Sequence, residues 1–433
     1  MDGVKRLLRG AGVRLVDIHE AADLVVINTC TVTAMADAKS RQLVRRARRA
    51  SPGARILVTG CGVAVEPELL AAADPAARLY DNESKGRLVA EMTELLSLAA
   101  GGAWPTLSGV EAAADLVDET GSEGARDRTR AFVKIQDGCS FHCAYCIIPR
   151  ARGPERSLAA NDIVDDVTRA LSSGHREIVL TGINVGTYSD ADVNLPRLVR
   201  RLLDETDVER IRLSSVEPQH VTDELLAVWT ASGGRCLPHF HVPLQSGDDT
   251  ILRRMGRRYD TAAYQRVVAR VREAIPSAAV HADLIVGFPG EDAAAWARTM
   301  DLLRRLELAG VHVFRYSSRP GTPAARMAGQ VDASTKKRRA TEALALAAQA
   351  RERYAEGRIG GEMRVLFEVP LPDGRWLGHA ESHALVVVDP PDGVPLHNVI
   401  GLVRAESVDP ASPDRIRGRL LALDAALARE TLA

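Results

Sequence analysis

Apolar and polar positions in the first hundred residues alternate between two periods. The apolar runs LVVIN at 24–28 and RILVTG at 55–60 predict two buried strands, and the basic stretch between them, which ends near Ala50, has the spacing of a helix. Strand, helix and strand joined by short turns are typical of an open parallel sheet. Because ligands of such sheets bind in the loops after the strands, Cys30 and Cys61, which directly follow these runs, are predicted to occupy ligand-binding loops.

A longer series of strand and helix patterns begins at Ala131. Its six strand candidates are AFVKI, REIVL, RIRLS, FHVPL, DLIVGF and VHVFRY. Each one continues into a polar, turn-rich segment: DGCSFHCAYC, TGINVGTY, SSVEPQH, QSGDD, GFPGE and SSRPGT. A repeated βα unit with its polar segments after the strands predicts a βα barrel whose chemistry lies on the carboxyl-terminal rim. Because six units fit, we expect a partial (βα)6 barrel over residues 131–333.

The last quarter of the chain changes character. A basic, Ala-rich helix is predicted over 334–358, and the short strand candidates MRVLFEV, RWLGHA, HALVVV and NVIGLVRAE follow within 359–424. Short strands with Gly and Pro turns predict a small β-barrel, a module that often contacts oligonucleotides. Residues 101–130 are rich in Gly, Ala, Asp and Glu without a period and are predicted to be a linker. The fold class is therefore α/β, with an N-terminal open parallel sheet domain over 1–100, the partial barrel and the small β-barrel.

Composition narrows the class of protein. The chain has 433 residues, 46% of them hydrophobic and 26% charged, which allows about three domains. No apolar run approaches the roughly 20 residues of a membrane helix, and MDGVKRLLRG lacks the apolar core of a secretory signal, so we expect a cytoplasmic protein without a membrane partner. The net charge of −1 gives no global sign of nucleic-acid binding, but the runs at 41–49 and 336–339 are strongly basic. Each run either contacts phosphate or is an ordinary solvated helix face.

The six cysteines are too few for a disulfide scaffold, and clustered cysteines in a reducing compartment more often serve metal or redox chemistry. Cys139, Cys143 and Cys146 form C-x3-C-x2-C in a loop opened by Gly138, and no second Cys or Cys/His pair follows nearby to complete a zinc site. Three thiolates on one tight loop suit three corners of a 4Fe–4S cluster, whose fourth iron can bind a substrate or cofactor. Cys236 precedes a barrel strand and is predicted to be structural.

The triplet carries a family resemblance. With the aromatic Tyr145 before the last cysteine it resembles the radical S-adenosylmethionine signature, and DGCSFHCAYCIIPRARG is closer still to the methylthiotransferases. The segments INTCTVT, VTGC, TGINVG, RLSSVEP, HVPLQSG and IVGFPGE are similar to motifs of that family in the same order. Within the family, the chain most resembles the branch that acts on N6-threonylcarbamoyladenosine beside the tRNA anticodon. The segments that carry this resemblance are TCTVT, KSR, QDGC, CIIPRARG and RLSSVEP.

The resemblance implies a tRNA methylthiotransferase with two 4Fe–4S clusters. In that family the open iron of the first cluster chelates S-adenosylmethionine, and an electron cleaves the sulfonium to a 5′-deoxyadenosyl radical. A second S-adenosylmethionine methylates a sulfur on the other cluster, and the methylthio group is transferred to C2 of adenine at tRNA position 37. The implied partners are the tRNA anticodon stem-loop and an electron donor such as a flavodoxin or ferredoxin, without DNA.

Other readings of the same motifs stay open. Sister branches of the family act on isopentenyladenosine in tRNA or on a ribosomal-protein aspartate. A protein of another class, a non-catalytic iron–sulfur RNA-binding protein, is also conceivable. The C-terminal module resembles the TRAM RNA-binding domain.

The resemblance also implies that Cys30 and Cys61 ligate the second, sulfur-handling cluster. The family supplies three cysteines to that cluster, and this chain has none before Cys30. Met1 is predicted to lie inside the helix that follows the family's first strand, so the N-terminal domain lacks that strand. Either the start is placed too far downstream or the second cluster is impaired.

Residues on the barrel rim are predicted to contact the cofactor. Gly182 and Asn184 are assigned to the amino acid moiety, Ser215 and Glu217 to the ammonium or ribose, Gln245 to the ribose, and Gly287 and Gly290 to the adenine, with Tyr145 beside them. Each glycine could equally serve a turn. His239 and His241 alternate along one strand and should face the same way, either in packing or as a metal pair.

Overall fold

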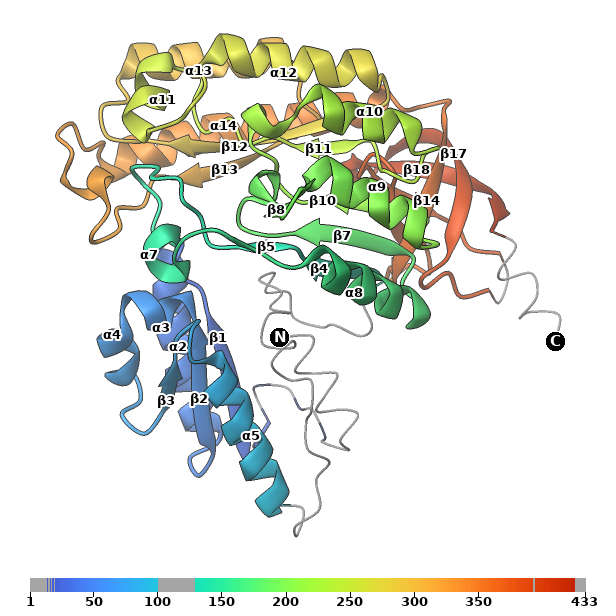
Figure 1. The fold of residues 1–433 in the computed structure, drawn as a ribbon. Helices are drawn as coiled ribbons and strands as arrows, with labels where there is room; N and C mark the ends of the chain where they lie inside the picture. The colour runs from blue at the N-terminus through green and yellow to red at the C-terminus, as the bar shows by residue number, and fades with distance from the viewer. Residues whose placement is uncertain are drawn as a thin grey trace. The chain divides into compact units, whose positions relative to one another are not determined.

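The computed structural model describes residues 14, 16, 18, 20–99, 129–391 and 394–424. These residues form two compact units, each gathered from separate segments of the chain. The first unit takes its residues from 1–123, 137–156 and 317–326, and the second from 124–136, 157–316 and 327–433. Figure 1 labels the helices and strands of both. The predicted linker falls outside the described residues except at its last two positions, and the domain boundaries stay a prediction.

The N-terminal part of the first unit is a three-stranded parallel sheet in the order β1-β2-β3. Its strands are β1 (Leu24–Thr29), β2 (Arg55–Gly60) and β3 (Arg78–Tyr80), and its helices are α2 (Ala34–Ala50), α3 (Cys61–Val65), α4 (Pro67–Ala71) and α5 (Lys85–Ala99). Helix α2 begins after Thr33, whose side chain accepts a hydrogen bond from the backbone N–H of Ala36. The predicted parallel sheet is confirmed, β3 was not predicted, and the expectation about the family's first strand lies outside the described residues.

The second unit contains all six predicted barrel strands. They are β4 (Arg130–Lys134), β7 (Glu177–Thr181), β10 (Ile211–Leu213), β11 (His239–His241), β12 (Ala279–Val286) and β13 (Gly310–Arg315). Two parallel sheets, β10-β7-β4 and β11-β12-β13, are joined by parallel bridges from Ile211 to Cys236 and from Ser215 to His241. The strands therefore follow one another in chain order, as a partial βα barrel requires.

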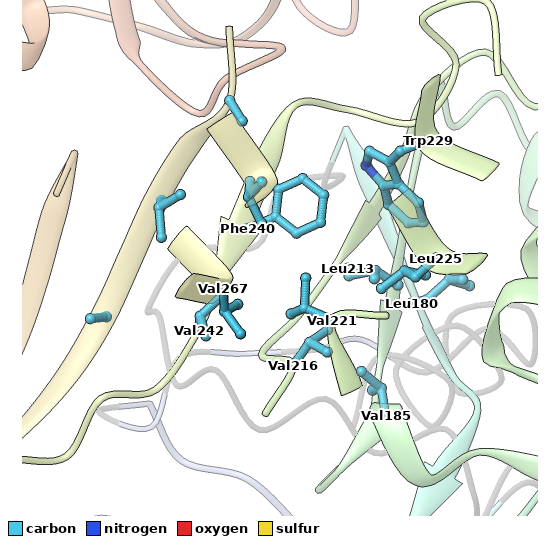
Figure 2. Packing of buried hydrophobic residues seen from close by; sticks show 14 of the residues in the cluster. Leu180, Val185, Leu213, Val216, Val221, Leu225, Trp229, Phe240, Val242 and Val267 are labelled. Carbon is cyan, nitrogen blue, oxygen red and sulfur yellow. The ribbon is translucent and has the colours of Figure 1, made fainter. Parts of the chain in front are cut away.

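Helices cover the apolar face of these strands. They are α8 (Ala160–Ser172), α9 (Leu195–Glu205), α10 (Asp223–Ala231), α11 (Asp249–Met255), α12 (Thr261–Ala274), α13 (Ala293–Leu306) and α14 (Ala333–Glu356). Figure 2 shows Leu180 of β7 and Leu213 of β10 beside Leu225 and Trp229 of α10, in one buried cluster. Within the part of the chain that is described, no helix is long and apolar enough to cross a membrane.

Short elements complete the connections between these helices and strands. They are the helix α7 (Ile148–Arg152), the strands β5 (Gln136–Asp137), β6 (Arg156–Ser157), β8 (Ser189–Asp190) and β9 (Val193–Asn194), and the 3-10 turns η1 (Val185–Thr187), η2 (Pro218–His220) and η3 (Pro323–Arg326).

The C-terminal strands of the second unit close into a five-stranded barrel in the order β14-β15-β16-β18-β17. They are β14 (Glu362–Pro370), β15 (Trp376–Ala380), β16 (Leu385–Val388), β17 (Ile400–Asp409) and β18 (Ser412–Leu423). The predicted small β-barrel is confirmed. Its last strand, β18, was not among the predicted strands.

A buried ion pair fastens this small barrel to strand β10 within the second unit. The fully buried carboxylate of Glu177 accepts hydrogen bonds from Arg210 Nε at 2.9 Å and Arg212 Nε at 2.7 Å. Burial raises the pKa of Glu177, but the two guanidinium charges outweigh it and lower this pKa to about 2. The remaining guanidinium N–H groups donate at 3.1–3.4 Å to backbone carbonyl oxygens of the small barrel, those of Arg364, His379, Ala380 and Glu381.

Candidate active site

The cysteine triplet lies on a tight loop of the first unit, between β5 and α7. Gly138 opens the loop with a φ of +70°, and a Cβ atom there would lie 2.0 Å from the carbonyl oxygen of Pro154, so this position accepts only glycine. The backbone N–H of Cys139 donates to the Gly153 carbonyl at 3.1 Å. The backbone N–H of Phe141 donates to Cys139 Sγ at 3.3 Å, which favours the thiolate form that binds iron. The loop therefore fits a 4Fe–4S cluster in its donor atoms and in the stabilisation of their charge.

Cys30 and Cys61 leave neighbouring strands at the same edge of the N-terminal sheet. The parallel register pairs Thr29 with Gly60, and each cysteine is the next residue along its strand. Adjacent parallel strands lie about 4.8 Å apart, so the two cysteines start from backbone positions that two ligands of one cluster can share. Cys30 is exposed in a loop, whereas Cys61 is buried and begins helix α3. The prediction that Cys61 occupies a loop is therefore wrong, because the chain turns into a helix directly after β2.

Polar donors surround the sulfur of Cys61. Arg152, itself buried, lies with its Nε 3.3 Å from Cys61 Sγ and with its Nη1 2.9 Å from a carboxylate oxygen of Asp137. The Asn82 amide nitrogen lies 3.8 Å from the same sulfur and donates to the Ala151 carbonyl at 2.8 Å. A guanidinium and an amide therefore both face this sulfur. Neither residue was predicted from the sequence.

Cys61 lies beside the segment that follows the cysteine triplet, within the first unit. Cys61 and Val65 of α3 form a buried cluster with Ile147 and Ala151, which belong to the segment directly after Cys146. The half-buried Tyr145 lies on the same loop as Cys146. The fold thus brings a predicted ligand of the second cluster beside the helix that follows the first cluster's loop.

A distant segment holds the loop after Cys30. Arg319 is 2% exposed, donates to Thr31 Oγ1 at 2.6 Å and forms an ion pair with the carboxylate of Asp37 on α2. The hydroxyl of Ser317 accepts a hydrogen bond from the Ala34 backbone at 3.0 Å. Residues 317–326 therefore belong structurally with the N-terminal sheet, although they follow the last barrel strand in the sequence.

The rim segment TGINVG belongs to the second unit, where Gln136 holds it. Gln136 Oε1 accepts hydrogen bonds from the backbone N–H groups of Ile183 at 3.1 Å and Asn184 at 2.9 Å. A Cβ atom on Gly182 would lie 2.7 Å from the carbonyl oxygen of Gln136, which explains glycine there by close packing. Asn184 is 4% exposed, and neither of its amide atoms has a hydrogen-bond partner among the described residues. Leaving such a group unpaired costs about 1–3 kcal/mol, so Asn184 is suited to bind a polar ligand group.

The next rim residues differ in the contacts that they already make within the protein. Ser215 bridges to His241 between parallel strands. Glu217 forms an ion pair with Arg257; burial raises the pKa of Glu217, and the Arg257 charge opposes that rise. Its carboxylate therefore already has a counter-charge. Gln245 has a φ of +65°, which is unusual for a residue other than glycine and occurs often at functional sites.

Gly287 and Gly290 are explained by backbone geometry. Their φ angles are +76° and +87°, and a Cβ atom on Gly287 would lie 2.3 Å from Lys336 Cγ. The backbone N–H of Gly287 donates to Glu291 Oε1 at 2.9 Å. The turn requirement accounts for both glycines, and their proposed contact with adenine stays a prediction.

Both basic runs contribute some of their charges to internal structure. In the run 336–339, Arg339 is buried and pairs with Glu291 at 2.7 Å, so it cannot contact phosphate. In the run 41–49, Arg48 pairs with Asp74 at 2.9 Å. The arginines in that run that stay exposed are Arg45 and Arg49.

Comparison with known proteins first defines the class. Residues 133–303 match the radical SAM superfamily, and residues 1–80 match the uncharacterized protein family UPF0004. The solved structure of the radical S-adenosylmethionine methyltransferase TsrM from Kitasatospora setae, with cobalamin and a [4Fe–4S] cluster bound, aligns with a TM-score of 0.52 at 17% identity. That alignment covers 74% of this chain and 68% of the other. The protein therefore has the radical SAM fold.

Curated relatives then define the family. The chain is 34% identical over 395 residues to the threonylcarbamoyladenosine tRNA methylthiotransferase MtaB of Bacillus subtilis, covering 89% of this chain and 86% of the relative. It is 33% identical over 434 residues to the tRNA-2-methylthio-N(6)-dimethylallyladenosine synthase of Maricaulis maris, covering 97% and 93%. The chain belongs to the radical SAM tRNA methylthiotransferases, which confirms the resemblance of its motifs.

Proposed function

We propose that this enzyme converts N6-threonylcarbamoyladenosine at tRNA position 37 to its 2-methylthio derivative, using S-adenosylmethionine and two 4Fe–4S clusters. The name of the Bacillus subtilis relative supports this substrate, as do the TCTVT and RLSSVEP segments. The two-cluster reading rests on one observation. Cys30 and Cys61 follow register-paired strands, and Cys61 packs beside the helix that follows the cysteine triplet.

The cysteines have distinct roles in this proposal. Cys139, Cys143 and Cys146 ligate the first cluster, and Cys30 and Cys61 supply thiolates to the second. When bound, the first cluster and S-adenosylmethionine supply the radical chemistry that the unreactive C2–H bond of adenine requires. The protein's own contribution is to hold the cysteine loop in shape through Gly138 and to place Arg152 and Asn82 beside the sulfur of Cys61.

The rim residues of the second unit are proposed to bind S-adenosylmethionine. Asn184 has the firmest support, because its buried amide lacks partners among the residues that the structure describes. Such a group recognises the amino and carboxylate groups of an amino acid moiety well. The other proposed contacts in this unit are Gly182, Ser215, Glu217, Gln245, Gly287 and Gly290. Tyr145 belongs to the first unit, and its contact with the cofactor is proposed from the sequence motif alone.

The proposed partners follow from the substrate. The closed C-terminal barrel and the exposed arginines of α2 are proposed to contact the tRNA anticodon stem-loop, mainly through phosphate. A flavodoxin or ferredoxin is proposed to deliver the electron, and the reaction is proposed to take place in the cytoplasm.

Mass spectrometry of tRNA nucleosides tests the substrate. Cells that lack the gene should lose 2-methylthio-N6-threonylcarbamoyladenosine and accumulate its unmodified precursor. Wild-type protein should restore the modified nucleoside, and Cys143→Ala should not. An undiminished level of the modified nucleoside in the deletion strain would contradict the proposal.

The second candidate substrate is isopentenyladenosine in tRNA. It is favoured by the relative from Maricaulis maris, whose alignment covers 97% of this chain. The same nucleoside analysis separates the two, because each precursor and product has its own mass. Loss of the 2-methylthio form of isopentenyladenosine alone would favour this second candidate.

A further inference from the structure

One face of the sheet β11-β12-β13 in the second unit carries imidazole and carboxylate side chains that the proposed reaction does not use. The register pairs His241 with His281 and Asp283 with His312, and alternate residues of a strand share a face. The other face carries Phe240 and other members of the buried apolar cluster. The polar side chains are therefore gathered by strand pairing, from three segments of the chain.

Three of these side chains converge on one point. His241 Nε2 lies 2.9 Å from Asp283 Oδ1, and His312 Nδ1 lies 3.4 Å from the same oxygen. The ligand atoms of all three residues lie within 4.8 Å of one another. Ligands that are about 2.1 Å from one metal ion are separated by about 3.0 Å at right angles and about 3.4 Å in a tetrahedron. The two separations from Asp283 Oδ1 are in the range that a shared metal ion would produce.

The Nε2 atom of His241 is buried, and the carboxylate oxygen of Asp283 faces it at 2.9 Å. A cation shared by these two atoms would bind the lone pair of the imidazole and the negative charge of the carboxylate together. His312 is 58% exposed in its side chain and gives a cation access from solvent.

The local charges also favour a cation. Asp283 brings a carboxylate between the two imidazoles. The buried guanidinium groups of Arg212 and Arg257 are each paired with a carboxylate, that of Glu177 or Glu217. The second group of histidines, His239, His281 and His383, contains no carboxylate, so it offers no such charge.

We propose that His241, Asp283 and His312 bind one borderline divalent cation of the Zn²⁺ class. Two imidazoles and a carboxylate are the donor set of open zinc and iron sites, whereas Mg²⁺ prefers oxygen donors alone. Three protein ligands leave coordination positions open for a further oxygen ligand. This site is separate from the cysteines and goes beyond the proposed tRNA methylthiolation.

Calorimetric titration with Zn²⁺ tests the site without turnover. Cluster-loaded protein, prepared anaerobically and freed of loosely bound zinc by a mild chelator, is expected to bind one Zn²⁺ per chain at this site and to show no heat with Mg²⁺. Asp283→Asn and His312→Gln should each weaken this binding at least ~100-fold. The matched control is His397→Gln, which changes an exposed histidine of the small barrel that is not part of the site. This variant should bind Zn²⁺ as the wild type does.

The two variants differ in how much each substitution endangers folding. Should Asp283→Asn fail to fold by circular dichroism, His312→Gln decides, because its side chain is exposed. Wild-type binding no stronger than that of His312→Gln would overturn the proposal. Since neither S-adenosylmethionine nor tRNA is present, this result is independent of the nucleoside analysis that tests the proposed function.

Discussion

Cys61 and Cys236 are two cysteines with nearly the same burial and very different surroundings. Their exposed fractions are 5% and 4%. The sulfur of Cys61 lies beside the donors Arg152 and Asn82, whereas Cys236 belongs to the apolar core of the second unit. Burial raises the pKa of the Cys236 thiol to about 12, against partial opposition from Ser232 and Arg235. Burial alone therefore does not distinguish these two cysteines, whereas the groups that face each sulfur do.

Cys61 and Cys236 also lie at opposite ends of the strands beside them. Cys61 follows the carboxyl end of β2, the edge where parallel sheets bind ligands. Cys236 precedes β11 and bridges to Ile211, the first residue of β10. The expectation that Cys236 is structural is supported by this place at the amino end of the strands.

The largest expected effect is the difference in activity between a variant of the cysteine triplet and a variant of Cys236. Cys143→Ala should reduce both 5′-deoxyadenosine formation and tRNA methylthiolation to background, because the first cluster loses a ligand. Cys236→Ala should keep most of both activities, because it removes only a packed sulfur. Liquid chromatography with mass detection measures both products in dithionite-reduced protein. Equal inactivity of the two variants, with Cys236→Ala still folded, would break the comparison.

The next effect sharpens the role of Cys61. Cys61→Ala should abolish methylthiolation but leave 5′-deoxyadenosine formation within about tenfold of wild type, because only the second cluster is affected. Iron per chain should fall by about half if each cluster holds four irons. Iron assay and product analysis of the same preparation check both statements. Unchanged methylthiolation would show that Cys61 resembles Cys236 in function as well as in burial.

A smaller effect is expected from the donor beside Cys61. Arg152→Gln removes the charge that faces the sulfur and leaves Asp137 without its partner, so methylthiolation should fall ~10- to 100-fold. Arg169→Gln, which alters an exposed arginine of α8, is the control and should behave as wild type. Initial rates with purified tRNA give the comparison. A fall of less than twofold for Arg152→Gln would argue that the donors near Cys61 do not matter.

The smallest effect concerns stability at alkaline pH. The Cys236 thiol keeps its proton in the folded protein up to about pH 12, whereas the unfolded chain releases it near its ordinary pKa of 9.0. Its contribution is fully present below pH 9 and is lost as the pH rises toward 12, by about 1.4 kcal/mol at pH 10. Urea unfolding of wild type and Cys236→Ala at pH 8 and pH 10 measures the difference. Parallel changes in the two proteins would contradict the assigned pKa.

Local patterns predicted most of the fold. The six barrel strands appear close to their predicted places because each lies in an apolar run that continues into a polar, turn-rich segment, and helix α14 because it is long. Strand β3 has three residues, none of them buried, so no apolar run marks it. Strand β18, SPDRIRGRLLAL, contains three arginines and a glycine, so its strand character comes from pairing with β16 and β17. Helix α3 is five residues long and gives no helical signal, which is why Cys61 was assigned to a loop.

The residues of the candidate site were likewise predicted only in part. The cysteines and the rim segments were found because they lie in short motifs. Arg319 with Asp37, Arg152 with Cys61, and Asp283 with His241 and His312 were missed because these partners are separated by tens to hundreds of residues. Such pairings depend on strand register and chain return, which no local pattern contains.

The junction between strand β10 and the small C-terminal barrel has an evolutionary consequence. Arg210 and Arg212 donate hydrogen bonds to four main-chain carbonyl oxygens of that barrel. Every amino acid has such an oxygen. At these four contacts the barrel's side chains are free to diverge, and so to adapt to different RNA surfaces, while the attachment persists. Other contacts depend on side chains of the module, such as Glu368 with Arg130 and Asp424 with Arg176. Chimaeras that exchange this module between relatives should stay joined so long as Glu177, the two arginines and these ion pairs remain.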